Sequence, residues 1–388
     1  MEDVSLFRSE FPITESYTFL NHAAVSPVSM RVVKAVESLF REFSHCGIDC
    51  YPKWMKRIAE VRRHFARLIH CDPDEVAFIG NTSDGLSAIA AGLEWKKGDI
   101  VLVPRPDFPA NIYPWMNLER QGVLLQFIER QEGRFGVKEI ENALRPDARL
   151  LSVSSVDFAT GFRSDLEALG DFCKKKGLLF CVDAIQSLGI IPMDVRKSGI
   201  HFLASGSHKW LLGAMGCGAL FISKDVNDMV HPGQVGWKSV EDEEDFFRVH
   251  FDLKPDALRF EPGTLNVAGI YAFGAAVDLL LEVGIERIYQ RVLAINTLFF
   301  DGLMDRNIHI TTPMDKGERS GILSFAPSAE PTSLFKSLTR KKIMVSLRDG
   351  LIRISPHFYN NEQDVLCFFE ALDDFSNMDN PNAQKYTC

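Results

Sequence analysis

The sequence predicts an α/β fold in which a mostly parallel β-sheet is flanked by helices. Short apolar runs of strand length stop abruptly at polar residues, and segments with helical apolar spacing lie between them. The two clearest runs, residues 178–182 and 202–204, end just before Asp183 and just before Ser205. Because 388 residues are too many for one ordinary hydrophobic core, we also expect two domains.

The other elements are predicted from the same patterns. Residues 17–20 form a short apolar run, and residues 29–70 carry apolar side chains at helical spacing. Residues 351–355 alternate in the manner of a half-buried strand. Further strands are expected at residues 75–80, 99–104, 150–156, 219–223 and 320–325, and a further helix at residues 270–283.

Composition argues against several classes of protein. The formal net charge is −9, from 43 basic and 52 acidic residues, which disfavours nucleic acids and anionic membranes as partners. No apolar run reaches the length of a membrane span. The acidic start at residues 1–5 lacks the apolar core of a secretion signal, so we expect a cytoplasmic protein.

The cysteines are predicted to be free thiols in a reducing compartment, because none lies in a Cys-x-x-Cys pair and no secretion signal precedes them. Cys46 and Cys50, next to His45, come nearest to a metal-ligand cluster. No second ligand pair has suitable spacing, so no metal is expected. The eight cysteines are Cys46, Cys50, Cys71, Cys173, Cys181, Cys217, Cys367 and Cys388.

Polar residues follow the two clearest strands at the point where each strand ends. Asp183 and Gln186 follow one, and His208 and Lys209 follow the other. Ligands of open α/β sheets bind beyond the carboxyl ends of the strands, so these four side chains should converge on one crevice. A surface cation is the ordinary interpretation of a lysine. Lys209, however, lies between apolar segments, where lysines are paired or chemically used.

The runs Val182-Asp183-Ala184-Ile185-Gln186-Ser187 and Ser207-His208-Lys209-Trp210 resemble the class-V aminotransferase family, whose members use pyridoxal 5'-phosphate (PLP). That family also contains cysteine desulfurases, kynureninase and isopenicillin N epimerase. The resemblance covers nearly the whole chain and implies the fold-type-I PLP-dependent transferase fold. It implies a large PLP-binding domain at residues 21–268, with a seven-stranded sheet, and a small α+β domain at residues 1–20 and 269–388.

The resemblance assigns roles to the residues in these two runs. Lys209 would form a Schiff base with PLP, and the Asp183 carboxylate would hold the pyridine nitrogen protonated. Gln186 would donate to the ring phenolate. His208, with Ser207 beside it, would contact the phosphate.

A second phosphate contact is expected where the strand at residues 75–80 runs into a helix. The unpaired N–H groups of a helix N-terminus favour an anion there, and the resemblance puts Thr82 and Ser83 on the PLP phosphate. Plain N-capping by Asn81, Thr82 or Ser83 explains the same sequence.

Phe108 and Arg353 match two further positions of the family. Phe108 follows the strand at residues 99–104, where relatives stack a ring on the cofactor, although phenylalanine is more often part of a core. Arg353 is similar to the arginine that binds the substrate carboxylate bidentately. The alternative is an arginine on a surface strand. Arg348 and His357 are further candidates.

Asn21, His22 and Thr264 are assigned by resemblance alone. The segment at residues 16–28, with Asn21 and His22, resembles one that passes over the substrate end of the site, and an ordinary strand-to-helix turn explains it equally well. Thr264 is similar to a residue that reaches the PLP phosphate of a partner, so a homodimer with shared active sites is expected. From sequence alone, Pro-Gly-Thr is a turn.

Four departures from the family leave the reaction open. Ser155, Asp157 and Phe158 stand where many relatives contact the cofactor or substrate. Cysteine desulfurases carry a nucleophilic cysteine shortly before the arginine, whereas residues 341–353 contain none, which disfavours a persulfide-forming desulfurase. We therefore expect a PLP-dependent aminotransferase acting on a small amino acid. The alternatives are a lyase of the cysteine or selenocysteine type, an isopenicillin N epimerase-like enzyme, and a non-catalytic PLP-binding dimer.

Overall fold

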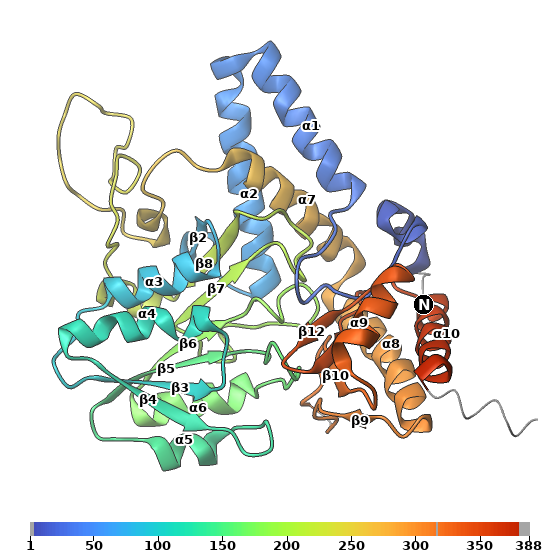
Figure 1. Ribbon diagram of the computed structural model, residues 1–388. Helices are drawn as coiled ribbons and strands as arrows, with labels where there is room; N and C mark the ends of the chain where they lie inside the picture. The colour runs from blue at the N-terminus through green and yellow to red at the C-terminus, as the bar shows by residue number, and fades with distance from the viewer. Residues whose placement is uncertain (1–3, 316, 380–388) are drawn as a thin grey trace, which may run out of the picture.

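The centre of the protein is a seven-stranded, mostly parallel sheet flanked by helices, which confirms the predicted fold class (Figure 1). The structure is a computed structural model that describes residues 4–315 and 317–379. The strand order is β2-β8-β7-β6-β5-β3-β4. The strands are β2 (Val76–Ile79), β3 (Ile100–Arg105), β4 (Leu124–Glu129), β5 (Ala148–Ser154), β6 (Leu179–Asp183), β7 (Phe202–Gly206) and β8 (Gly218–Ile222).

Strand direction brings the polar strand ends together. β8 runs antiparallel to both its neighbours, and the other adjacent pairs in this sheet are parallel. The carboxyl ends of β2, β3, β5, β6 and β7 therefore share one edge. From β3 the chain proceeds to β4 on one side and later to β5 on the other, so β3 and β5 flank the topological switch point where ligands bind in such sheets.

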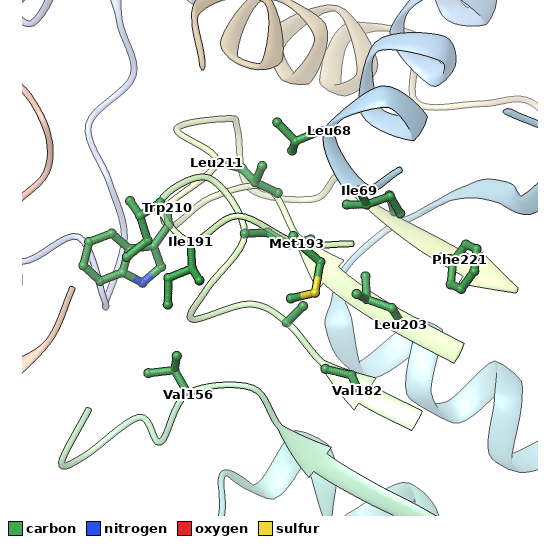
Figure 2. Close-up of a cluster of buried hydrophobic side chains, with 14 of the residues drawn as sticks. Leu68, Ile69, Val156, Val182, Ile191, Met193, Leu203, Trp210, Leu211 and Phe221 are labelled. Carbon is green, nitrogen blue, oxygen red and sulfur yellow. The ribbon is translucent and has the colours of Figure 1, made fainter. Parts of the chain in front are cut away.

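Helices cover both faces of the sheet. One face carries Leu68 and Ile69 of α2 against Val182, Leu203 and Phe221 of three adjacent strands (Figure 2). The opposite face packs against α3 and α4. The helices are α1 (Met30–His45), α2 (Tyr51–Ile69), α3 (Thr82–Gly92), α4 (Tyr113–Met116), α5 (Val137–Ala143), α6 (Leu166–Lys176), α7 (Val267–Val283), α8 (Ile285–Asp305), α9 (Pro331–Arg340) and α10 (Glu362–Asp379).

A second, four-stranded antiparallel sheet lies beside the first, with α8, α9 and α10 around it (Figure 1). Its order is β12-β13-β10-β9. The N-terminal strand β1 pairs in parallel with β11 of this C-terminal part. The predicted division of the chain at residue 268 stays a prediction, and α7, just beyond it, packs against α1 and α2. The strands are β1 (Thr18–Phe19), β9 (His309–Ile310), β10 (Leu323–Ala326), β11 (Ile343–Met344), β12 (Ser346–Arg348) and β13 (Leu351–Ile354).

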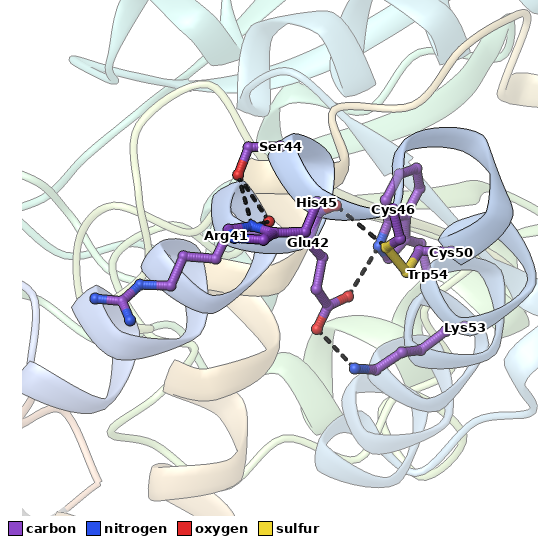
Figure 3. Close-up of a disulfide and its surroundings, with 8 residues drawn as sticks. All are labelled: Arg41, Glu42, Ser44, His45, Cys46, Cys50, Lys53 and Trp54. Atoms are coloured by element: carbon purple, nitrogen blue, oxygen red, sulfur yellow. Dashed lines mark hydrogen bonds and ion pairs between the residues drawn. A yellow bond between two sulfur atoms is a disulfide. The ribbon is translucent and has the colours of Figure 1, made fainter.

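Cys46 and Cys50 form a disulfide, so the prediction that every cysteine is a free thiol is wrong for this pair (Figure 3). The helical pattern at residues 29–70 is broken by a 3₁₀ turn, Gly47–Cys50, between α1 and α2. This turn brings the two α-carbons to 5.8 Å, within the range that a disulfide requires. Cys388 lies outside the described residues, and the remaining cysteines, Cys71, Cys173, Cys181, Cys217 and Cys367, are free.

Reduction of this disulfide should lower the stability of the folded protein only modestly. The bridge joins residues 4 apart in sequence, and so short a loop is worth about 2 kcal/mol by the loop-entropy estimate. We expect a reductant to shift the denaturant midpoint of the wild type downward. The Cys46→Ser, Cys50→Ser double variant should unfold at one midpoint with or without reductant. A wild-type midpoint that ignores the reductant would contradict the assignment.

No single helix among the described residues is long and apolar enough to cross a membrane. α7 and α8 meet those requirements only when counted together, and they are bent by 80° at the break between them.

Candidate active site

A cavity of about 360 Å³ lies at the edge where the parallel strands end. It is built from strand ends and loops that are far apart in sequence, as expected for ligand sites of open α/β sheets. Most of the residues singled out from the sequence meet there. Those that line it are Thr82, Ser83, Phe108, Asp183, Gln186, His208, Lys209 and Arg353.

Lys209 follows the end of β7 and is largely buried. Its Nζ lies 5.6 Å from the centroid of the Phe108 ring. Burial lowers the pKa of Lys209 below its usual range, and the nearby Asp183 carboxylate opposes this shift. A larger fraction of the amine is therefore neutral near physiological pH, which is the form that attacks a carbonyl carbon.

Asp183 is the last residue of β6 and is 2% exposed. Its Oδ1 accepts a hydrogen bond of 3.0 Å from the backbone N–H of Ile185. Burial raises the pKa of Asp183, although this hydrogen bond and the positive charge of Lys209 favour the ionised form. A cation brought next to this carboxyl group would restore its negative charge.

Gln186 is held by both ends of its amide. Its Oε1 accepts from Trp210 Nε1 at 2.8 Å, and its Nε2 donates to the carbonyl of Ala23 at 3.1 Å. Trp210, the residue after Lys209, is fully buried. Because its ring cannot move freely, its hydrogen bond fixes the orientation of the Gln186 amide. His208 also lines the cavity, and burial lowers its pKa, which favours the neutral imidazole.

The N-terminus of α3 opens into the cavity. Asn81 is the N-cap, since its Oδ1 accepts from the N–H of Asp84 at 3.0 Å. Capping by Asn81 leaves Thr82 and Ser83 in the first turn, where both line the cavity. Thr82 Oγ1 also accepts from the N–H of Gly206 at 2.9 Å, which ties this turn to the end of β7. A helix N-terminus in this position favours an anion.

Arg353 is 2% exposed, so the alternative of a surface arginine is wrong. Its Nη1 donates to the carbonyl of Phe158, and its Nη2 donates to Ser346 Oγ at 3.4 Å. Its Nε is buried and has no partner among the described residues, and no described carboxylate lies within ion-pair distance. Burial lowers the pKa of Arg353 to about 10, an effect that nearby Arg348 reinforces. A buried cation without a counter-ion is costly, and an incoming carboxylate would offset that cost.

Asn21 and His22 do not reach the cavity, contrary to the prediction that they bind substrate. His22 is fully buried, with Nδ1 2.8 Å from the carbonyl of Ser355 and Nε2 2.6 Å from Tyr359 Oη. The Asn21 Oδ1 accepts from Ser346 Oγ at 2.6 Å. Both side chains join the N-terminal segment to the C-terminal part. The next three residues, Ala23, Ala24 and Val25, line the cavity instead.

Ser207 and Thr264 also lie away from this cavity. Ser207 is fully buried, and its hydroxyl donates to the carbonyl of Ala214 at 2.7 Å, so it supports the loop around Lys209 and is not positioned to contact a cofactor. Thr264 lines two other cavities, of about 700 and 640 Å³, and does not line the one with Lys209. Its predicted contact with the site of a partner stays a prediction.

Phe158, whose role the sequence left open, lines the cavity next to Phe108. The two rings meet edge to face, with centroids 5.3 Å apart, at the ends of the strands that flank the switch point. Asp157 is instead buried, where it accepts from Thr160 Oγ1 at 2.8 Å and lies 3.2 Å from Arg130. Asp157 therefore stabilises the turn that carries Phe158. The hydroxyl of Ser155 donates a hydrogen bond of 3.1 Å to the backbone carbonyl of Asp183.

Arg348, a further candidate from the sequence for binding the substrate carboxylate, lines the cavity as well. The Asp349-Gly350 pair, a common two-residue hairpin turn, supports this placement. Such a turn fixes the pairing of β12 with β13 and therefore the face on which Arg348 lies.

The family model described as "Aminotransferase class-V" matches residues 18–368. The chain belongs to the class-V aminotransferase family. Its cofactor is PLP, and the cavity fits that group. It offers a buried lysine amine, a buried carboxyl group, a helix N-terminus for an anion and a guanidinium without a counter-ion.

Relatives and solved structures agree with this membership. The chain is 30% identical to a "Probable cysteine desulfurase" of Methanothermobacter thermautotrophicus, over 97% of this chain and 98% of the relative. An apo cysteine desulfurase from Thermococcus onnurineus superposes with a TM-score of 0.89 at 26% identity, covering 97% of this chain and 98% of that one. A mutant of the protein C-DES, with glycine covalently linked to its PLP cofactor, has the same fold (TM-score 0.88, 21% identity, 94% and 99% coverage).

Proposed function

We propose that this enzyme is a PLP-dependent lyase that removes a sulfur substituent from the β-carbon of a small amino acid. Relatives named cysteine desulfurase support a lyase over the aminotransferase expected from the sequence. The observation that carries the proposal is a cavity with Lys209, Asp183 and Arg353 but no cysteine among its described lining residues. The amino acid and one water would give a 2-oxo acid, ammonia and the free thiol or sulfide.

Each proposed role follows from the geometry. PLP, when bound, supplies an electron-poor ring that stabilises negative charge at the substrate α-carbon. Lys209 holds the cofactor and, once released, takes the α-proton, which its lowered pKa favours. Asp183 holds a proton on the pyridine nitrogen. Arg353 binds the α-carboxylate and so turns the α-proton toward Lys209.

The remaining contacts are proposed to orient the cofactor. The Gln186 amide, fixed by Trp210, faces the cavity as a donor to the ring oxygen. His208 and the α3 N-terminus at Thr82 and Ser83 surround the phosphate. Phe108, 42% exposed and close to Lys209, lies ready to stack on a flat ring.

Direct release of the sulfur product is proposed because no thiol among the described residues is placed to accept it. The free cysteines among the described residues are Cys71, Cys173, Cys181, Cys217 and Cys367, and none of them lines the cavity. The hairpin just before Arg353 turns through Asp349 and Gly350 alone, so that turn has no room for a reactive cysteine.

We further propose that the active form is a homodimer. The loop at residues 240–251, yellow in Figure 1, projects next to the tip of the α1–α2 hairpin. On it Phe247 and Val249 are 100% and 99% exposed, and such apolar exposure marks an association surface. Thr264 lies in a cavity between this loop and that hairpin. Light scattering should therefore report a dimer, and a stable monomer at micromolar concentration would contradict this proposal.

An aminotransferase is the second candidate, because the same lining residues serve both reactions and the family model carries that description. Products separate the two. A lyase should release ammonia and a 2-oxo acid over many turnovers without any 2-oxo acid acceptor. An aminotransferase should release at most one equivalent of 2-oxo acid, no ammonia, and resume only when an acceptor is added. A protein that turns over no amino acid in either assay would refute both proposals.

Asp183→Asn should lower kcat by about 10²-fold or more, because a neutral amide cannot hold a proton on the pyridine nitrogen. The amide Oδ1 can still accept from Ile185, so the fold should be kept. In the cofactor-free protein the pKa of Asp183 is raised by burial, so the free energy of unfolding should fall as the pH rises above the usual aspartate range. The Asn variant should lack this pH dependence. Unchanged kcat together with an unchanged pH–stability profile would contradict the assignment.

A further inference from the structure

Arg348 and Arg353 lie on one face of a tight hairpin. β12 and β13 pair with Ser346 opposite Arg353 and Arg348 opposite Leu351. Directly opposed residues project to the same side, so the two arginines are diagonal neighbours, which in antiparallel pairs lie about 7–8 Å apart. The turn between them, Asp349 and Gly350, is left-handed at both positions (φ 46° and 79°), which fits a two-residue hairpin and fixes this register.

Both guanidinium groups line the cavity with Lys209. The only described carboxylate that lines it is Asp183, at the end of β6. Arg348 is exposed, and its one hydrogen bond within the described chain goes to the adjacent carbonyl of Leu347, at 3.1 Å. No carboxylate among the described residues lies within ion-pair distance of either arginine.

Two cations on one face, without a carboxylate partner among the described residues, repel each other. The charge of Arg348 lowers the pKa values of both Arg353 and Lys209. One substrate carboxylate neutralises only Arg353. A ligand with two acidic groups, spaced to meet both guanidinium groups, would remove the remaining excess of positive charge at the cavity opening.

We propose that Arg348 binds a second acidic group carried by the substrate side chain, so that the enzyme prefers amino acids with a side-chain carboxylate. For the lyase this means a cysteine thioether whose sulfur-bound group is acidic, which would leave as the free thiol. The inference rests on the proposed function in one respect, namely that Arg353 takes the α-carboxylate. Arg348 is in this account a specificity residue, because it would contact the substrate side chain and not the reacting α-carbon.

Binding of amine-free acids tests the proposal without any reaction. Calorimetric titration of the cofactor-loaded protein would compare succinate with butyrate and glutarate with valerate. The wild type should bind each dicarboxylate on the order of tenfold more tightly than its monocarboxylate counterpart. Arg348→Gln should abolish this difference and keep the monocarboxylate affinity, and Arg348→Lys should retain part of it. Arg340→Gln, an exposed arginine on α9, is the matched control and should behave as the wild type.

Two outcomes would overturn the proposal: a wild type without a dicarboxylate preference, or a preference that survives in Arg348→Gln. Steady-state kinetics give a second test, in which KM and kcat are compared for S-carboxymethylcysteine, which is acidic, and S-ethylcysteine, which is neutral. Arg348→Gln should raise the KM for the acidic substrate alone, and any change in kcat, through the charge near Lys209, should be the same for both substrates. An equal loss of kcat/KM for both substrates contradicts a specificity role. A different result would refute the proposed function alone. In that case no ammonia or 2-oxo acid would be released, while dicarboxylates would still bind in a way that depends on Arg348.

Discussion

Lys209→Ala is expected to lower turnover by about 10³-fold or more, the largest effect of any single substitution considered. The variant loses the amine that both holds the cofactor covalently and takes the α-proton. Borohydride reduction of the wild type should fix the cofactor to the peptide that contains Lys209. The variant should retain cofactor only by noncovalent contacts and release it on denaturation.

The matched control is Lys175→Ala, an exposed lysine on α6. It should keep wild-type turnover and covalent cofactor attachment, so that a general effect of losing a lysine is separated from the loss of this one. Turnover retained in Lys209→Ala, measured as product per enzyme over an hour, would refute the assignment of this residue and with it the proposed mechanism.

Arg353→Gln is expected to lower kcat/KM for amino acids by about a hundredfold or more. Removing one partner of a buried charge pair costs roughly 2–5 kcal/mol, and each 1.4 kcal/mol is a factor of ten. Arg353 has a buried Nε without a partner, and no carboxylate among the described residues lies within ion-pair distance of it. Asp157 only partly opposes the lowering of its pKa by burial, so the charge of Arg353 is a cost to the free protein. The thermal midpoint of the cofactor-loaded variant should therefore stay close to that of the wild type.

Arg353→Lys serves as the conservative control, and it should recover part of the lost affinity because the positive charge remains while the bidentate geometry is lost. Steady-state kinetics and thermal unfolding on the same preparations check both statements. A hundredfold loss accompanied by a large fall in the midpoint would show that Arg353 acts through the fold, and an unchanged kcat/KM would remove it from the carboxylate site.

Strand ends are the part of the site that local sequence predicts well. Asp183 and Lys209 each follow an apolar run, and parallel strands place such ends at one edge, so their meeting in one cavity could be foreseen. The residues that were misplaced depend on contacts across the chain. His22 is turned away by Tyr359 and Ser355, more than 330 positions later, which no local pattern records.

Two further features depend on backbone geometry: the disulfide, which was not predicted, and the position of Arg348, which was named from the sequence only as a candidate. The Cys46–Cys50 bridge depends on a 3₁₀ turn inside a stretch whose apolar spacing is helical throughout. The approach of Arg348 to the cavity depends on the register of β12 with β13, and a slip of one residue would point it to the opposite face.

The pairing of the N-terminal segment with the C-terminal strands sets the order in which the enzyme can be completed during synthesis. All seven strands of the central sheet have been made once residue 222 has left the ribosome, so the half that holds Lys209 and Asp183 can form early. The segment at Ala23 to Val25 already has a partner in this half, since Gln186 donates to the Ala23 carbonyl. Its contacts with Ser355, and Arg353 itself, must wait for the C-terminal strands. The growing chain therefore passes through a stage with a cofactor lysine but no substrate pocket, and contacts of this sequence separation form slowly.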